Sequence, residues 1–156
     1  MKYPNLEKLV DIIAVLRSEN GCEWDREQTH KSLRPNMLEE AYEAVDAIDE
    51  GDISNLREEL GDVLLQVVLH AQIAKDDGEF DIEDVAKELS DKLIHRHPHV
   101  FGNTEVHSTQ EILDNWDKLK KEEKTYRKSV LDGISKSQSA LMSAQKISKK
   151  VVKVGF

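Results

Sequence analysis

Two acidic pairs stand out because their spacing places the members of each pair on one side of a helix. Glu40 and Glu43 belong to the run EEAYE, and Glu59 and Asp62 belong to EELGD. Residues three or four positions apart share a helix face. Carboxylates withdrawn from water need a positive partner, and neither run contains Lys or Arg. A hard divalent cation, Mg²⁺ or Mn²⁺, is the simplest partner because it prefers oxygen ligands.

The alternative is an ordinary solvated acidic surface, and the two pairs differ in how well it fits them. Around EEAYE this alternative stays open, since Asp46, Asp49 and Glu50 continue the acidic charge. The second pair is surrounded by apolar residues, which favours a functional site there. It belongs to a narrow polar strip on an otherwise apolar helix, made of Asn55, Glu59, Asp62, Gln66 and His70.

Two helices should present these acids to each other. Apolar residues around most of the circumference predict that the helix over 52–74 is buried on nearly all sides. The helix from Pro35 to Glu50 has an apolar stripe of Met37, Leu38, Ala41, Ala44, Val45 and Ile48. Gly51 and Asp52 predict a turn that packs the two helices antiparallel. The four carboxylates would then converge.

The other expected elements are also helices and loops. Asn5 should cap a helix over 6–18, and a polar loop follows in which Trp24 is either a packing anchor or a base-stacking residue. Gly78 and Asp81 should separate the long helix from one over 82–97, which Pro98 ends. Ser108 and Glu111 predict a capping box for a helix over 109–124.

Several smaller groups could also do chemistry. Glu27 and His30 form one ExxH pair, a weak metal signal in a loop. Three histidines, His95, His97 and His99, alternate around Pro98 and fit loop capping better than a metal site. Lys92 and Arg96 are either a solvated face or, beside an acidic metal cluster, groups that neutralise a triphosphate.

Composition limits the classes of function. The chain has 156 residues, of which 34% are charged and 5% aromatic, and this favours one helical domain over a β-sandwich. A net charge of −9 argues against non-specific nucleic-acid or anionic-membrane binding. The single cysteine, Cys22, indicates a reducing compartment. There is no apolar run of membrane-spanning length and no signal-peptide core, so we expect a soluble cytoplasmic protein.

Five segments together resemble the MazG family of nucleoside triphosphate pyrophosphohydrolases over residues 1 to about 128. They are CEWDREQTHKSL, LEEAYE, LREELGDVLLQVVLHAQIA, DKLIHRHPHVFG and NWDKLKKEEK. EExxE followed by ExxD is the metal signature of that family. Glu23 departs from the usual proline of CPWD, a change in the loop and not in the acids.

The resemblance implies an all-α, MazG-like helical bundle that forms a homodimer. It also implies Mg²⁺-dependent cleavage of NTPs or dNTPs between the α and β phosphates, giving nucleoside monophosphate and pyrophosphate and so clearing nucleotide pools. Glu39 matches a supporting acid that helps to position water. The remaining carried-over residues are the metal ligands Glu40, Glu43, Glu59 and Asp62, and the substrate-binding residues Lys92, Arg96, Trp116 and Lys120.

The tail differs from the rest of the chain. Residues 1–128 are expected to form the MazG-like domain, and residues 129–156 resemble a linker and the first helix of a second such domain. The basic amphipathic helix in this tail should dock on protein rather than membrane. It motivates an alternative function, a non-catalytic dimerisation module that binds nucleotide and metal and serves a partner or a second domain.

Overall fold

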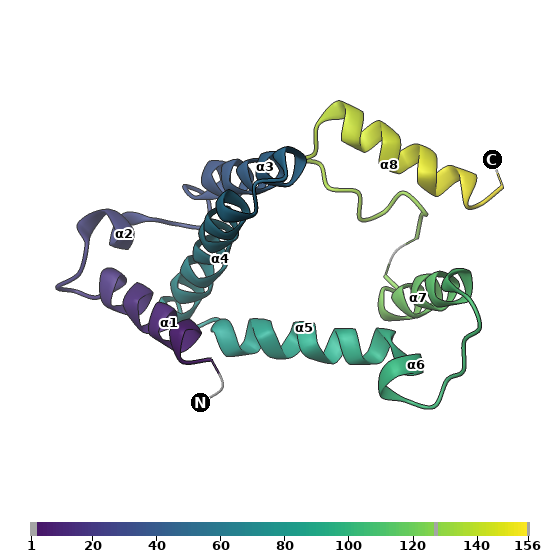
Figure 1. Ribbon diagram of the computed structural model, residues 1–156, viewed down its shortest axis with the longest axis horizontal. Helices are drawn as coiled ribbons and strands as arrows, with labels where there is room; N and C mark the ends of the chain where they lie inside the picture. The colour runs from purple at the N-terminus through teal and green to yellow at the C-terminus, as the bar shows by residue number, and fades with distance from the viewer. Residues whose placement is uncertain (1–2, 127, 156) are drawn as a thin grey trace. The chain divides into compact units, whose positions relative to one another are not determined.

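The computed structural model describes residues 3–126 and 128–155 (Figure 1). The helices are α1 (Pro4–Arg17), α2 (Glu23–Glu27), α3 (Arg34–Glu50), α4 (Ile53–Asp76), α5 (Ile82–Arg96), α6 (Pro98–Phe101), α7 (Thr109–Glu123) and α8 (Ala140–Val152). No strand occurs in the described ranges, which confirms the all-α fold class. None of these helices is both long and apolar enough to cross a membrane.

The chain divides into two compact units, one up to Ser90 and one from Asp91 onward, with α5 crossing the division. The domain boundary expected between residues 128 and 129 stays a prediction.

A tight turn joins α3 to α4, as the sequence predicts. Gly51 adopts a φ of +70°, a left-handed conformation that glycine tolerates best, and its N–H donates to the carbonyls of Ala47 and Ile48. Asp52 caps α4, its side chain accepting hydrogen bonds of 3.0 Å from the N–H groups of Ser54 and Asn55. The two helices pack along each other from this turn, which sets the register of the acidic residues.

The apolar core of the first unit lies at the carboxyl-terminal half of α4. Its buried members are Ile13, Leu33, Val68, Leu69 and Ile73. The amino-terminal half of α4 is covered by α3 on one side only, so Ile53 is 74% exposed and Leu60 is 53% exposed. The prediction that this helix is buried on nearly all sides is therefore wrong for the single chain, because α1 and Leu33 cover only its carboxyl-terminal half and α3 covers one side of the remainder.

The apolar stripe predicted on α3 is also only partly correct. Ala44 is buried, but Leu38, Ala41, Val45 and Ile48 are exposed. The helix buries Ala44 and Ala47 instead, whose small side chains allow a close approach to α4.

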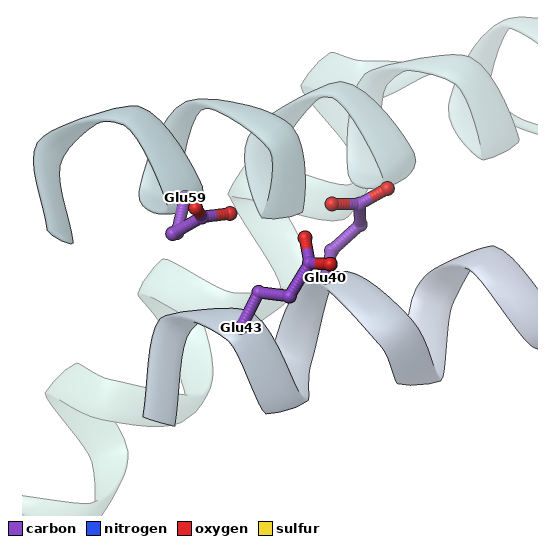
Figure 2. A group of neighbouring side chains, drawn as sticks. All are labelled: Glu40, Glu43 and Glu59. Carbon is purple, nitrogen blue, oxygen red and sulfur yellow. The ribbon is translucent and has the colours of Figure 1, made fainter. Parts of the chain in front are cut away.

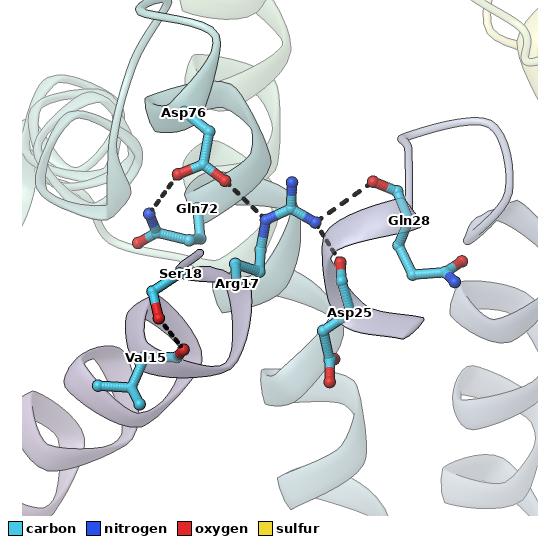
Figure 3. Close-up of polar contacts among 7 residues, drawn as sticks. All are labelled: Val15, Arg17, Ser18, Asp25, Gln28, Gln72 and Asp76. Carbon is cyan, nitrogen blue, oxygen red and sulfur yellow. Dashed lines mark hydrogen bonds and ion pairs between the residues drawn. The ribbon is translucent and has the colours of Figure 1, made fainter. Parts of the chain in front are cut away.

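Residues 21–33 contain a short helix, α2, where the sequence predicted only a loop. Arg17, at the end of α1, holds this segment in place (Figure 3). Its Nε donates to Asp76 Oδ2 at 2.7 Å, and its Nη1 donates to the backbone carbonyls of Asp25 and Gln28. Trp24 is 56% exposed and therefore does not anchor the segment by packing.

Asp81 caps α5 as expected, its carboxylate accepting from the N–H groups of Glu83 and Asp84. In the second unit Ser108 accepts from the N–H of Glu111 at the start of α7. The carboxylate of Glu111 accepts from the N–H of His107 rather than from that of Ser108, so the capping box is displaced by one residue. Residues 98–101 form a short helix, α6, inside the predicted loop.

Candidate metal and phosphate site

Three carboxylates from α3 and α4 converge in the first unit. Glu40 and Glu43 lie one turn apart on α3, and Glu59 faces them from α4 (Figure 2). Each offers one oxygen, and the three oxygens all lie within 4.8 Å of one another. Glu40 and Glu59 are half-buried, whereas Glu43 is exposed. The antiparallel packing of the two helices thus produces the grouping that the sequence predicts for these three residues.

Asp62 and Glu39 lie beside this group. Asp62 is half-buried one turn after Glu59, and its charge acts on both Glu40 and Glu59. It does not contribute an oxygen to the group within 4.8 Å, so the structure gathers three of the four predicted ligands. Glu39 is exposed on α3, and its charge acts on Glu40.

The electrostatics of the group are those of unpaired like charges. Burial raises the pKa of Glu40, and the carboxylates of Asp62, Glu43, Glu39 and Glu59 raise it further. The pKa of Glu59 is raised first by burial, then by the charges of Glu43, Asp62 and Glu58, and last by a hydrogen bond with Glu43. Carboxylates this close repel one another when ionised. A cation between them would remove that repulsion.

The donor set fits a hard cation. It consists of carboxylate oxygens alone, which suits Mg²⁺ or Mn²⁺ and does not suit zinc or copper, for which nitrogen and sulfur ligands are preferred.

Gln66 continues the polar strip of α4 one turn beyond Asp62. It is only 4% exposed, and its Oε1 has no hydrogen-bond partner among the described residues. A buried acceptor of this kind can receive a hydrogen bond from a hydroxyl, an amine or a water.

A second group of predicted residues meets in the second unit. The Arg96 guanidinium lies over the Trp116 ring, 5.4 Å from its centroid. Arg96 also donates two hydrogen bonds to the Glu123 carboxylate, and this interaction raises the pKa of Arg96. Lys92 is half-buried one turn before Arg96, and Lys120 is exposed one turn after Trp116. The structure therefore brings Arg96 and Trp116 together and leaves both lysines in the neighbouring turns of their helices.

Residues 28–101 match the model of the MazG nucleotide pyrophosphohydrolase domain. The fold is similar to the crystal structure of a mazG-related protein from Thermotoga maritima. The sequences are 31% identical, the TM-score is 0.62, and the match covers 74% of this chain and 98% of that one. The chain belongs to the MazG family.

Three longer proteins are also similar to this chain. A nucleoside triphosphate pyrophosphohydrolase/pyrophosphatase MazG from Thermotoga maritima is 50% identical over 96% of this chain, and a nucleoside triphosphate pyrophosphohydrolase from Escherichia coli K12 is 47% identical over 97%. An uncharacterized protein, YabN, from Bacillus subtilis is 50% identical over 94%. The chain spans 58%, 59% and 30% of the lengths of these relatives, respectively.

The MazG match divides the predicted site residues. All five acids lie within residues 28–101, as do Lys92 and Arg96. Trp116 and Lys120 lie beyond the matched range, on α7.

Two contacts of this MazG chain were missed by sequence reasoning. Glu123 binds Arg96, but it sits in the charged run KKEEK, which is typical of a solvated helix face. Its one signal is its position seven residues after Trp116, which places both on one face of α7. His97 meets Trp116 edge to face at 4.8 Å, and its Nδ1 bonds the Leu93 carbonyl at 2.6 Å. The hydrogen bond to Leu93 lies at the carboxyl-terminal end of α5, in the region where the sequence predicts a capping role for His97.

Proposed function

We propose that this chain is a Mg²⁺-dependent nucleoside triphosphate pyrophosphohydrolase that converts NTPs or dNTPs to nucleoside monophosphate and pyrophosphate. The main support is the group of three carboxylate oxygens, from Glu40, Glu43 and Glu59, that lie within 4.8 Å of one another. Two helices supply them, and further negative charge surrounds them. Two similar proteins, from Thermotoga maritima and Escherichia coli, are named nucleoside triphosphate pyrophosphohydrolases, which supports the same activity. Mn²⁺ fits the same ligands.

Each residue has a role in the proposed reaction. Glu40, Glu43, Glu59 and Asp62 would hold the ion. When bound, Mg²⁺ neutralises charge on the phosphate oxygens and acts as a Lewis acid. Lys92 and Arg96 stabilise the negative charge of the phosphates, and Trp116 and Lys120 contact the nucleotide.

The hydrolytic step is a displacement at the α-phosphorus. Glu39 helps to position the water, and a carboxylate of the acidic group accepts its proton as the water oxygen bonds to phosphorus. The bond from the α-phosphorus to the bridging oxygen breaks, and pyrophosphate leaves with that oxygen. Positioning and charge neutralisation supply most of the rate enhancement.

A homodimer is part of the proposal, and the uncovered face of α3 and α4 supports it. Five apolar side chains, each at least 50% exposed, are spaced to share a face of their helices: Leu38, Val45, Ile48, Ile53 and Leu60. An apolar surface of this kind is typical of an interface. Val45→Glu should dissociate the dimer in size-exclusion chromatography with light scattering. Leu113→Glu on α7 should not, although Leu113 is similarly exposed, at 54% against 50% for Val45.

The cellular role follows from the proposed reaction. Hydrolysis of nucleotides would clear nucleotide pools, and the single cysteine supports a cytoplasmic location. The net charge of −9 supports a small-molecule substrate rather than nucleic acid.

The deciding experiment is chromatography of a panel of NTPs and dNTPs incubated with Mg²⁺ and the full chain. Wild type should yield monophosphate and pyrophosphate, Glu59→Gln should yield neither, and Glu50→Gln, at the far end of α3, should behave as wild type. Diphosphate with phosphate would refute α,β cleavage. Nucleotide that is bound but not cleaved would support the non-catalytic module instead.

A further inference from the structure

Arg96 and Glu123 are the last residues of α5 and α7, and their side chains join the two helix ends. Arg96 Nε donates to Glu123 Oε1 at 3.0 Å, and Arg96 Nη2 donates to Glu123 Oε2. Each carboxylate oxygen accepts from a different nitrogen. A bidentate pair of this kind fixes the plane of the guanidinium as well as its position.

Aromatic neighbours restrict the guanidinium further. Arg96 is 9% exposed, and Trp116 lies against it at 5.4 Å. His97 meets Trp116 edge to face, and the Leu93 carbonyl fixes His97 in turn. The guanidinium therefore has one orientation, set by Glu123 at its edge and by Trp116 at its face.

The hydrogen bonds to Glu123 occupy only part of the guanidinium. Glu123 uses the edge that carries Nε and one N–H of Nη2. The Nη1 group and the second N–H of Nη2 form the opposite edge of the fork, which Glu123 does not bind. That edge matches two oxygens of a phosphate.

We propose that Glu123 is a positioning residue that holds Arg96 so that its Nη1 and Nη2 edge binds phosphate oxygens of the substrate. The inference rests on the proposed function, because it takes a triphosphate as the ligand. Glu123 does not touch the substrate and acts through Arg96.

The alternative to positioning is that Glu123 competes with phosphate for the Arg96 guanidinium. Considered by charge alone, a carboxylate beside a phosphate should weaken phosphate binding. The hydrogen bonds from Arg96 lower the pKa of Glu123, so this carboxylate stays ionised beside the proposed phosphate ligand. Removing its negative charge should strengthen phosphate binding if only charge matters. Positioning predicts the reverse, since a carboxamide offers one acceptor oxygen to the fork and not two. The sign of the effect therefore separates the two possibilities.

The test measures binding of inorganic tripolyphosphate to the full chain with Mg²⁺ by isothermal titration calorimetry. Glu123→Gln should weaken binding about tenfold, the loss of one charge-assisted hydrogen bond. Glu122→Gln, its neighbour on α7, removes the same charge and should bind within about twofold of wild type. In an Arg96→Lys background, Glu123→Gln should have no further effect, because lysine lacks the fork.

Kinetics give the second measurement. Glu123→Gln should raise KM for the nucleotide and change kcat little, and Glu123→Asp should restore part of the affinity. Tighter or unchanged binding in Glu123→Gln would overturn the proposal. A chain that binds tripolyphosphate in this pattern but releases no pyrophosphate would refute the proposed activity and leave the role of Glu123 intact. If Glu123→Gln does not fold, the tripolyphosphate affinity of Glu123→Asp decides, and an affinity equal to wild type would count against positioning.

Discussion

The Nδ1 atoms of His30 and His70 lie 2.7 Å apart, with the two imidazole rings in nearly parallel planes. One nitrogen must donate and the other accept, so the pair shares a single proton at this contact. A second proton there would place two donors face to face. His30 in the 28–33 segment is thereby bonded to α4, through a histidine that the ExxH pattern did not point to.

Replacing His30 should change the titration of His70. Burial lowers the pKa of His70 below 6.5, and the charge of His30 lowers it further. His30→Ala removes the second cause, so the pKa of His70 should rise toward 6.5 in an NMR titration of the imidazole protons. A pKa that stays the same or falls would contradict this account.

The same depressed pKa makes stability depend on pH in a defined direction. Between the folded pKa of His70 and 6.5, the unfolded chain binds more protons than the folded chain. The contribution of neutral His70 to the free energy of unfolding is therefore complete above pH 6.5. It is lost as the pH falls through the pKa of His70 in the folded chain. Urea denaturation of wild type and His70→Gln across this range should show the loss in wild type alone.

Replacing Arg17 should lower the free energy of unfolding more than replacing any other polar side chain of the first unit. Its side chain is 8% exposed and serves Asp76 and two backbone carbonyls. Arg17→Ala should lower the free energy of unfolding by about 2 kcal/mol, since those carbonyls lose a charged donor. Arg34→Ala, an exposed arginine at the start of α3, is the control for urea denaturation. Equal losses in the two variants would show that Arg17 does not hold this segment.

Neutralising one of the three clustered carboxylates should raise the melting temperature without a cation and reduce the stabilisation that an added cation gives. Glu43→Gln should raise the melting temperature in chelator, because it relieves repulsion on Glu40 and Glu59. It should also reduce the temperature shift that Mg²⁺ produces in wild type. Differential scanning fluorimetry measures both, and Asp49→Asn on the same helix is the control. A full Mg²⁺ shift in Glu43→Gln would exclude this residue as a ligand.

Removing the cap of α4 should weaken the turn that sets the acidic register. Asp52→Ala abolishes two hydrogen bonds of 3.0 Å and should cost about 1 kcal/mol in the free energy of unfolding. Asp52→Asn, which keeps the acceptor oxygen, should recover most of this loss in urea denaturation. No difference between the alanine and asparagine variants would show that the cap does not contribute.

The sequence predicts features that depend on local chemistry. The turn at Gly51 and the cap at Asp52 follow from backbone conformation and short-range hydrogen bonds, and they place Glu40 and Glu43 opposite Glu59. The all-α class follows from composition and helical periodicity in the same way.

What the sequence does not predict depends on contacts between distant segments. The helix α2 has five residues, too few to be stable alone, and it is held by Arg17 from another helix. On α3, periodicity does not distinguish an apolar face that packs inside the chain from one left uncovered, so Ala47 was missed while Val45 was expected inside. The partnership of Arg96 with Glu123 joins the ends of two separate helices, which no local pattern encodes.

The tight turn between α3 and α4 has a consequence for the order of folding. Because one short connection separates the helices that carry Glu40 and Glu59, their contact has low contact order and closes a small loop. The ligand cluster can therefore assemble early, from a single helical hairpin, as soon as residues up to Asp76 have been synthesised. A cation bound there as proposed would favour the hairpin over the unfolded chain by mass action, so its first effect would be on folding.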